Sequence, residues 1–452
     1  MLRPALITAM AWPRQPYDRS VHPTAEFLGW AVAITLFAAL MFRALLAPDA
    51  LLFCTDDNIG ALAQRKAALP EILLTGWNDQ TFIGMREMVL PSWTNALLWG
   101  LPARTVNRLL HALDLSLASF FLVAFLRRRG CGRIASAIGA LTACWLGSNF
   151  TLVYAGHIGK FGVLLFASLA LWLTDRALAA PRRPITAAVA AGGAWGAMCL
   201  EQPDVALFWA AALGGFVLFR LHEAYGWNFR RWGPRLIPMA LTAGLIAVQP
   251  LVAGYLAAVK PVNTDAGDAE AHWHFITQWS WPPEETIDFI APGYTGWRTG
   301  EPEGPYWGRL GQSPEWPLRK EGFRNFKLEN HYVGAVPFVL AASALLGAAG
   351  AGKRRPAPPQ NASATRRARE TFFWAGVAIA TFLLALGKFT PLYRFVIALP
   401  GFGAVRAPVK WLQPFQVAVA ILAAFGWDLL WKGEESTPLR RTLVPLGIAT
   451  AV

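Results

Sequence analysis

The chain has 452 residues, of which 55% are hydrophobic and only 15% are charged, with a formal net charge of +13. Soluble proteins carry about 25% charged residues, so this composition and a mean hydropathy of +0.36 exclude an ordinary soluble protein. They predict an all-α polytopic membrane protein. Because the lysines and arginines lie in short segments between apolar runs, the positive charge does not indicate a nucleic-acid partner.

Apolar runs long enough to cross a bilayer recur along the chain, and we expect about ten or eleven transmembrane helices in one domain, 1–452. The last run, 442–452, would cover only about 16 Å as a helix, against a hydrocarbon core of about 30 Å. We therefore expect a fragment truncated within its last helix, although a short final helix is the alternative. The expected spans lie at 27–47, 109–126, 134–153, 161–179, 185–200, 204–221, 236–258, 332–351, 370–387, 411–431 and from 442.

Basic residues occur in the N-terminal tail and in every second connector, including a linker at 352–369. Positive charge favours the cytoplasmic side, so the pattern predicts a cytoplasmic N-terminus and a cytoplasmic linker. The long connectors 48–108, 259–331 and 388–410 are then extracytoplasmic loops. They carry much of the polar, aromatic and glycine-rich sequence, and we expect the function to lie there.

The first extracytoplasmic loop begins with adjacent carboxylates, Asp56 and Asp57, at the end of an apolar run. The amphipathic segment that follows predicts a helix at the membrane surface, and one of the two carboxylates is expected to be its N-cap. A cap needs only one carboxylate. The other is a candidate general base or cation ligand, and we favour Asp56.

Two short connectors hold further candidates. His157 and Lys160 lie three residues apart beside glycines and are candidates for binding a phosphate, whereas a lysine reaching the lipid headgroups is the alternative. Glu201 and Asp204 lie between two closely linked helices, where carboxylates tend to face an aqueous cavity. They are candidates for orienting a sugar or for neutralising the basic cluster, and a cap of the next helix is the alternative for Asp204.

The large loop 259–331 is rich in tryptophan and glycine. We interpret most of its aromatic residues as the core of a small loop domain, with carbohydrate stacking as the alternative. Pro282 to Thr286 resembles a helix start. His272 and His274 lack a third ligand nearby, so a zinc site is not expected there.

The third long loop places Arg406 and Lys410 directly before a span on the predicted outer side, against the general charge pattern. At this depth they would meet the phosphate of a lipid-linked donor, or ordinary lipid headgroups. Both interpretations stay open from the residues alone.

Several segments together resemble the YfhO-like bacterial membrane proteins, which are similar to the GT-C superfamily of membrane glycosyltransferases. The resemblance covers most of the chain through short motifs, and the acidic first loop fits it too. The motifs are Trp281-Pro282-Pro283-Glu284-Glu285, Ile290 to Gly296, Tyr306-Trp307-Gly308, Tyr332-Val333-Gly334, Leu386 to Leu392, Leu399 to Phe402 and Arg406 to Lys410.

The resemblance implies a GT-C-like fold in the bacterial inner (cytoplasmic) membrane. It implies transfer of a sugar from a polyprenyl-phosphate donor to an envelope polymer acceptor, with inversion and with a carboxylate as base. The acidic pair is not a spaced DxD, so a divalent metal stays open as a cofactor. The implied roles are catalysis by Asp56 or Asp57, donor phosphate binding by His157, Lys160, Arg406 and Lys410, and substrate binding by Glu201, Asp204, Trp281 and Glu284.

Two other classes of function compete with this hypothesis. A flippase or transporter for a lipid-linked polymer would need polar residues along several spans, and few are present. A non-catalytic subunit of an envelope assembly would use the aromatic loop 259–331 as an interface. Convergence of Asp56 or Asp57 with His157, Lys160, Arg406 and Lys410 on one cavity is the arrangement that an enzyme requires.

Overall fold

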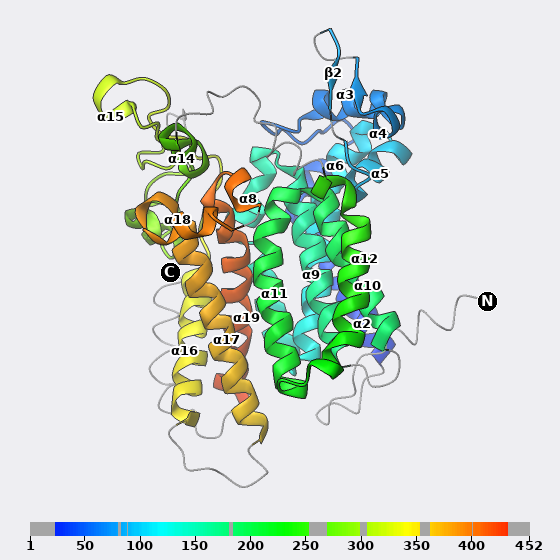
Figure 1. The fold of residues 1–452 in the computed structure, drawn as a ribbon, viewed down its shortest axis with the longest axis vertical. Helices are drawn as coiled ribbons and strands as arrows, with labels where there is room; N and C mark the ends of the chain where they lie inside the picture. Colours follow the sequence, from blue (N-terminus) through cyan, green and yellow to red (C-terminus); the bar gives the residue numbers. More distant parts are fainter. Residues whose placement is uncertain are drawn as a thin grey trace, which may run out of the picture.

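The computed structural model describes the chain as an almost wholly helical protein (Figure 1). Strand structure in the described part is a two-stranded antiparallel ladder of two residues each, β1 (Trp77–Asn78) and β2 (Met85–Arg86). The all-α prediction is therefore confirmed. The described residues are 23–79, 83–87, 89–179, 184–252, 269–298, 305–352, 362–399 and 401–432.

Within these residues, seven segments are long and apolar enough to cross a membrane. Helices α10 (Pro184–Glu201), α12 (Phe229–Ile246) and the shorter apolar α16 (Ala335–Gly352) overlap three further expected spans, α12 only over residues 236–246. The expected total of ten or eleven spans stays a prediction, and 253–258 and 442–452 lie outside the described residues. The seven segments are α2 (Pro23–Met41), α6 (Ala103–Arg128), α7 (Arg133–Cys144) with α8 (Gly147–Ala155), α9 (Ile158–Ala179), α11 (Pro203–Tyr225), α17 (Ala362–Ala385) and α19 (Leu412–Lys432).

Helix packing forms two neighbouring groups (Figure 1). Helix α9 packs against α6, α10 and α11, and α19 packs against α7, α16 and α17. Small residues allow the second group to approach closely, as is common between membrane helices. A Cβ on Gly426 of α19 would lie only 1.8 Å from the backbone oxygen of Leu340 in α16. Any larger residue would push these two helices apart.

The expected span 134–153 is broken into α7 and α8 at Trp145 and Leu146. Gly147 follows the break with a φ of +60°, and a Cβ there would lie 2.2 Å from the backbone oxygen of Tyr332. The side-chain amide of Gln416 in α19 donates to the backbone oxygens of Thr142 and Leu146. A neighbouring helix thus supplies the hydrogen bonds that the break removes.

The segments expected to be extracytoplasmic gather at one end of the bundle, here called the loop end (Figure 1). Leu62 and Ile72 from its first segment are buried in one cluster with Leu110 of α6. The predicted amphipathic stretch forms two short helices, α3 and α4, rather than one. The loop-end helices are α3 (Ile59–Ala68), α4 (Glu71–Thr75), α5 (Trp93–Gly100), α14 (Ala269–Thr277), α15 (Trp316–Arg319) and α18 (Leu392–Ile397).

The opposite end, the connector end, carries a buried ion-pair network. Asp175 at the end of α9 pairs with Arg128, Arg129 and Arg220, at 3.1, 3.2 and 3.0 Å. Arg129 also binds both carboxylate oxygens of Glu370 in α17, at 2.6 and 2.7 Å. These arginines therefore hold four helices together, a role beyond orienting the chain. Residues 362–369 of the expected linker belong to α17, while 353–361 lie outside the described residues.

Candidate functional site

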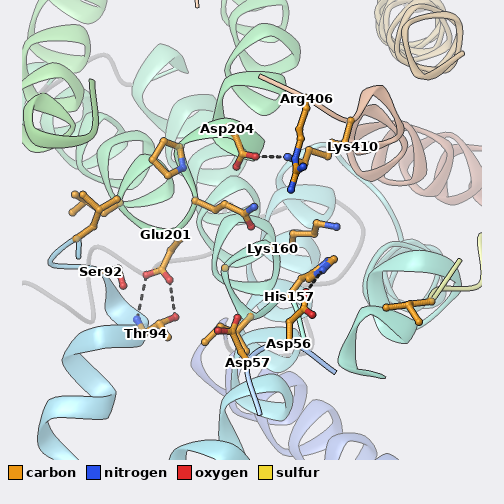
Figure 2. Close-up of a pocket in the computed structure, with 18 of the residues that line it drawn as sticks. Asp56, Asp57, Ser92, Thr94, His157, Lys160, Glu201, Asp204, Arg406 and Lys410 are labelled. Carbon is orange, nitrogen blue, oxygen red and sulfur yellow. Dashed lines mark hydrogen bonds and ion pairs between the residues drawn. The ribbon is translucent and has the colours of Figure 1, made fainter. Parts of the chain in front are cut away.

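A cavity of about 620 Å³ opens among the elements of the loop end (Figure 2). It lies where the acidic first loop meets the ends of α9, α10 and α11 and the segment before α19. Eight of the ten residues selected from the sequence line it. They are Asp56, Asp57, His157, Lys160, Glu201, Asp204, Arg406 and Lys410.

The acidic loop is fixed to the C-terminal end of α8 by its backbone. Asp56 N donates to Ala155 O at 3.1 Å, and Asp57 N donates to Gly156 O at 3.2 Å. Gly156 has a φ of +78°, and a Cβ there would lie 3.0 Å from both aspartate nitrogens. Glycine at 156 therefore permits both the turn and the close approach that place the carboxylates at the cavity.

The expected N-cap assignment is wrong. Asn58, not an aspartate, caps α3, because its Oδ1 accepts from Gly60 N at 3.0 Å and from Ala61 N at 3.1 Å. Asparagine and aspartate are about equally good caps, so the sequence did not distinguish them. Both carboxylates are consequently free for other interactions.

Asp56 forms a hydrogen bond with His157, with 2.8 Å between Oδ2 and Nε2. The ammonium of Lys160 and burial, together with Lys410, lower the pKa of His157 to about 3, so the imidazole is neutral at pH 7. A carboxylate can only accept, so Nε2 carries the proton. Nδ1 is then an acceptor, and it is buried and has no partner among the described residues.

Asp57 faces the same cavity but has a different partner. Its Oδ1 lies 3.2 Å from Nη2 of Arg65 on α3, and its side chain is 24% exposed. Burial raises the pKa of Asp57 above its usual value, against the opposing effect of Arg65. The two adjacent carboxylates thus differ in environment, and Asp56 is the more accessible, with 56% of its side chain exposed.

The opposite side of the cavity is basic. Lys410 pairs with Asp204 of α11, so its charge is largely neutralised. Among the described residues, Lys160 and Arg406 form no ion pair with a carboxylate, and Arg406 lies over the ring of Phe275 at 5.3 Å. Lys160 lies between the Asp204–Lys410 pair and the Asp56–His157 pair (Figure 2). The side chains of Lys160 and Arg406 can therefore bind an anionic ligand.

Glu201 forms the side of the cavity next to α5. Its Oε1 accepts from Trp93 N at 2.6 Å and its Oε2 accepts from Thr94 Oγ1 at 2.7 Å (Figure 2). A Cβ on Gly162 of α9 would lie 2.5 Å from Glu201 Oε2, so glycine leaves space for this carboxylate. Glu201 thus binds the first turn of α5, where negative charge is stabilising.

Two predicted substrate-binding residues lie away from this cavity. Trp281 is fully buried in the main hydrophobic core, stacked on Phe289 with 5.2 Å between ring centroids. Glu284 is in the 3₁₀ helix η2 (Pro283–Phe289), which confirms the predicted helix start, and it pairs with Arg309. Their sequence neighbours suggested a shared motif, but packing places both outside the cavity lining.

The cavity also contains charged residues that the sequence analysis did not select: Arg65, Glu87 and Glu329. Arg65 belongs to the amphipathic segment that was predicted to follow the acidic pair. It lies eight residues after Asp57, and α3 brings its guanidinium to the Asp57 carboxylate. Glu329 lies three positions before Tyr332 of the Tyr332-Val333-Gly334 motif and carried no separate signal.

Metal binding was left open by the sequence. Among the described residues, no group of three or more histidine, cysteine, aspartate or glutamate side chains is arranged to hold a metal ion. Three of the cavity carboxylates instead contact nitrogen atoms of basic side chains: Asp56 contacts His157, Asp57 contacts Arg65, and Asp204 contacts Lys410. A divalent ion would have to compete with these partners.

Comparisons with protein-family models, curated proteins and solved structures found no match. The resemblance to YfhO-like proteins and the GT-C superfamily therefore stays a prediction. The function has to be argued from the cavity itself.

Proposed function

We propose that the protein is a membrane glycosyltransferase that moves a sugar from a polyprenyl-phosphate donor to an acceptor hydroxyl of an envelope polymer. The observation that carries this proposal is the convergence of the acidic pair and the cations Lys160, Arg406 and Lys410 on one cavity. Sugar transfer from a lipid phosphate needs a base that takes the proton of the acceptor hydroxyl. It also needs positive charge that stabilises the departing phosphate on the other side of the anomeric carbon.

In the proposed reaction Asp56 accepts the proton of the acceptor hydroxyl. The hydroxyl oxygen then forms a bond to the anomeric carbon as the bond from that carbon to the donor phosphate oxygen breaks. The electron pair leaves with the polyprenyl phosphate, and Lys160 and Arg406 stabilise its charge. His157 holds Asp56 through the hydrogen bond from Nε2 and orients the carboxylate.

The donor's polyprenyl chain would lie in the bilayer with its phosphate at the level of the cavity. In this proposal the loop end faces the extracytoplasmic side of a bacterial inner membrane, and the N-terminus is in the cytoplasm. The basic connector end supports this orientation, because arginines and lysines are concentrated on cytoplasmic faces. Ten or eleven spans in a GT-C-like arrangement belong to the same proposal.

The test separates chemistry from donor binding. Asp56→Asn should lower transfer about 10²- to 10⁴-fold, because the general base is lost. It should leave binding of a short polyprenyl phosphate, such as farnesyl phosphate, almost unchanged. Lys160→Met with Arg406→Met should weaken that binding, while binding of the uncharged farnesol stays the same. Asp79→Asn and Arg324→Met, both at exposed positions, are matched controls.

Transfer is measured as envelope glycosylation in cells and as polyprenyl phosphate released in membranes. Full activity of both Asp56→Asn and Asp57→Asn would exclude a carboxylate base at this site. Unchanged binding of farnesyl phosphate by the double cation variant would exclude the proposed donor site. Activity with and without a chelator decides whether a divalent metal takes part.

A further inference from the structure

A second, much smaller cavity of about 20 Å³ lies beside the main one. Its lining includes Asn149 of α8, His331 of the segment before α16, and Lys160 itself. Lys160, Glu329 and Lys410 also line the main cavity, so the two cavities adjoin each other.

The small cavity brings together polar atoms that have no partner in the described part of the chain. Asn149 Nδ2 donates to Ala143 O at 2.7 Å, which fixes the amide and leaves its buried Oδ1 unpaired. Both ring nitrogens of His331 are buried and unpaired, since Nε2 lies 3.9 Å from Glu329 Oε1, beyond hydrogen-bond distance. The Lys160 ammonium makes no hydrogen bond or ion pair with another described residue. Unpaired buried polar groups are costly and usually bind water.

The protonation states around this cavity are complementary. Burial, with the ammonium groups of Lys327 and Lys160, holds the pKa of His331 well below its usual value, so the ring is neutral and has one acceptor nitrogen. Asn149 Oδ1 is a second acceptor, and the Lys160 ammonium is a donor. A molecule that bridges all three must accept one hydrogen bond and donate two.

The volume of the small cavity indicates what it can hold. A cavity needs about 10–15 Å³ to hold one water molecule, which typically makes two to four hydrogen bonds to protein groups. A volume of about 20 Å³ is therefore sufficient for one water molecule. We propose that this cavity is a binding site for a single structural water that joins Lys160 to Asn149 and His331.

This water would contact Lys160, a residue that also lines the main cavity. The backbone oxygen of Lys160 is already fixed by Gln413 Nε2 at 3.1 Å, and the water would fix the ammonium as well. The site also links α9 to the loop segment that carries Glu329 and His331. Its existence does not depend on the proposed transfer reaction, and it can be tested in the protein without any substrate.

The direct test is a map of the full chain in lipid nanodiscs at a resolution that shows ordered water. The wild type should show one density peak within hydrogen-bond distance of Lys160 Nζ, Asn149 Oδ1 and a ring nitrogen of His331. His331→Gln keeps a hydrogen-bonding side chain and should retain the peak. His331→Phe should lose it, whereas His272→Phe at an exposed position should keep it.

A double-mutant cycle measured by thermal unfolding tests the proposal without a map of the variants. Asn149→Leu and His331→Phe each remove one partner of the same water, so the loss in Tm of the double variant should be smaller than the sum of the two single losses. An empty cavity in the wild-type map, or strictly additive losses in Tm, would overturn the proposal.

Discussion

Asp56 and His157, which are 101 positions apart in the sequence, form a hydrogen bond of 2.8 Å at the rim of the main cavity. The bond joins the first loop to the connector between α8 and α9. Lys160 and Lys410 surround the histidine with positive charge. As a result, the carboxylate is oriented by a neutral imidazole rather than by an imidazolium.

This arrangement predicts an unusual titration for His157. Its pKa, lowered to about 3, should leave it uncharged from pH 5 to 8 in an NMR titration of labelled protein. Lys160→Met removes the largest cause of the shift, so the pKa should rise toward its ordinary value near 6.5. A wild-type titration midpoint near 6.5 would contradict the proposed neutral imidazole.

The same shift links stability to pH. The unfolded chain binds a proton at residue 157 below about pH 6.5, but the folded protein does not until about pH 3. His157 therefore stabilises the fold above about pH 6.5, and this contribution is lost as pH falls toward 3. Comparing the Tm of wild type and His157→Gln between pH 4 and 8 measures it, since the glutamine variant lacks this dependence.

Gly156 is predicted to be intolerant of a side chain. Gly156→Ala would need a positive φ and would place a Cβ 3.0 Å from Asp56 N and Asp57 N. We expect a loss of about 1–3 kcal/mol in the free energy of unfolding, together with displacement of the acidic loop. Gly214→Ala is the matched control, because Gly214 lies within α11 with nothing within 4 Å of an added Cβ. That control should stabilise the helix by about 0.5–1 kcal/mol.

Asn58 should contribute to stability through its cap. Asn58→Ala removes the acceptor for Gly60 N and Ala61 N and should lower the free energy of unfolding by about 0.5–2 kcal/mol. Asn58→Asp keeps the acceptor and should retain the stability. Hydrogen exchange of α3 amides localises the effect. Equal exchange in wild type and Asn58→Ala would mean that another group caps the helix.

The connector-end network should be intolerant of the loss of one partner. Glu370→Gln leaves Arg129 without its bidentate carboxylate partner in a buried site, and breaking a buried pair typically costs about 3–5 kcal/mol. Glu315→Gln, at an exposed loop position, should be nearly neutral. Thermal unfolding in detergent provides the comparison. A neutral Glu370→Gln would show that Asp175 alone balances the arginines.

The main cavity shows which site residues local sequence patterns can predict. Asp56, Lys160 and Arg406 were candidates because a charge at the end of an apolar run has to avoid lipid. Trp281 and Glu284 were instead selected as members of a motif that the family resemblance supplied, and both lie outside the cavity lining. A motif consists of residues that are neighbours along the chain. A cavity is lined by residues from distant segments, and packing decides which of them meet.

The sequence by itself determined that the chain is helical, roughly where its apolar helices lie, and which polar residues adjoin them. Those properties depend on hydropathy over a short window, which needs no knowledge of packing. Only the tertiary structure decided that Asn58 caps α3 and that Asp56 binds His157. It also decided that Asp204 neutralises Lys410 and that Asp175 forms ion pairs with three arginines. Charge pairing depends on distances of a few ångströms between helices, and chain order does not fix those distances.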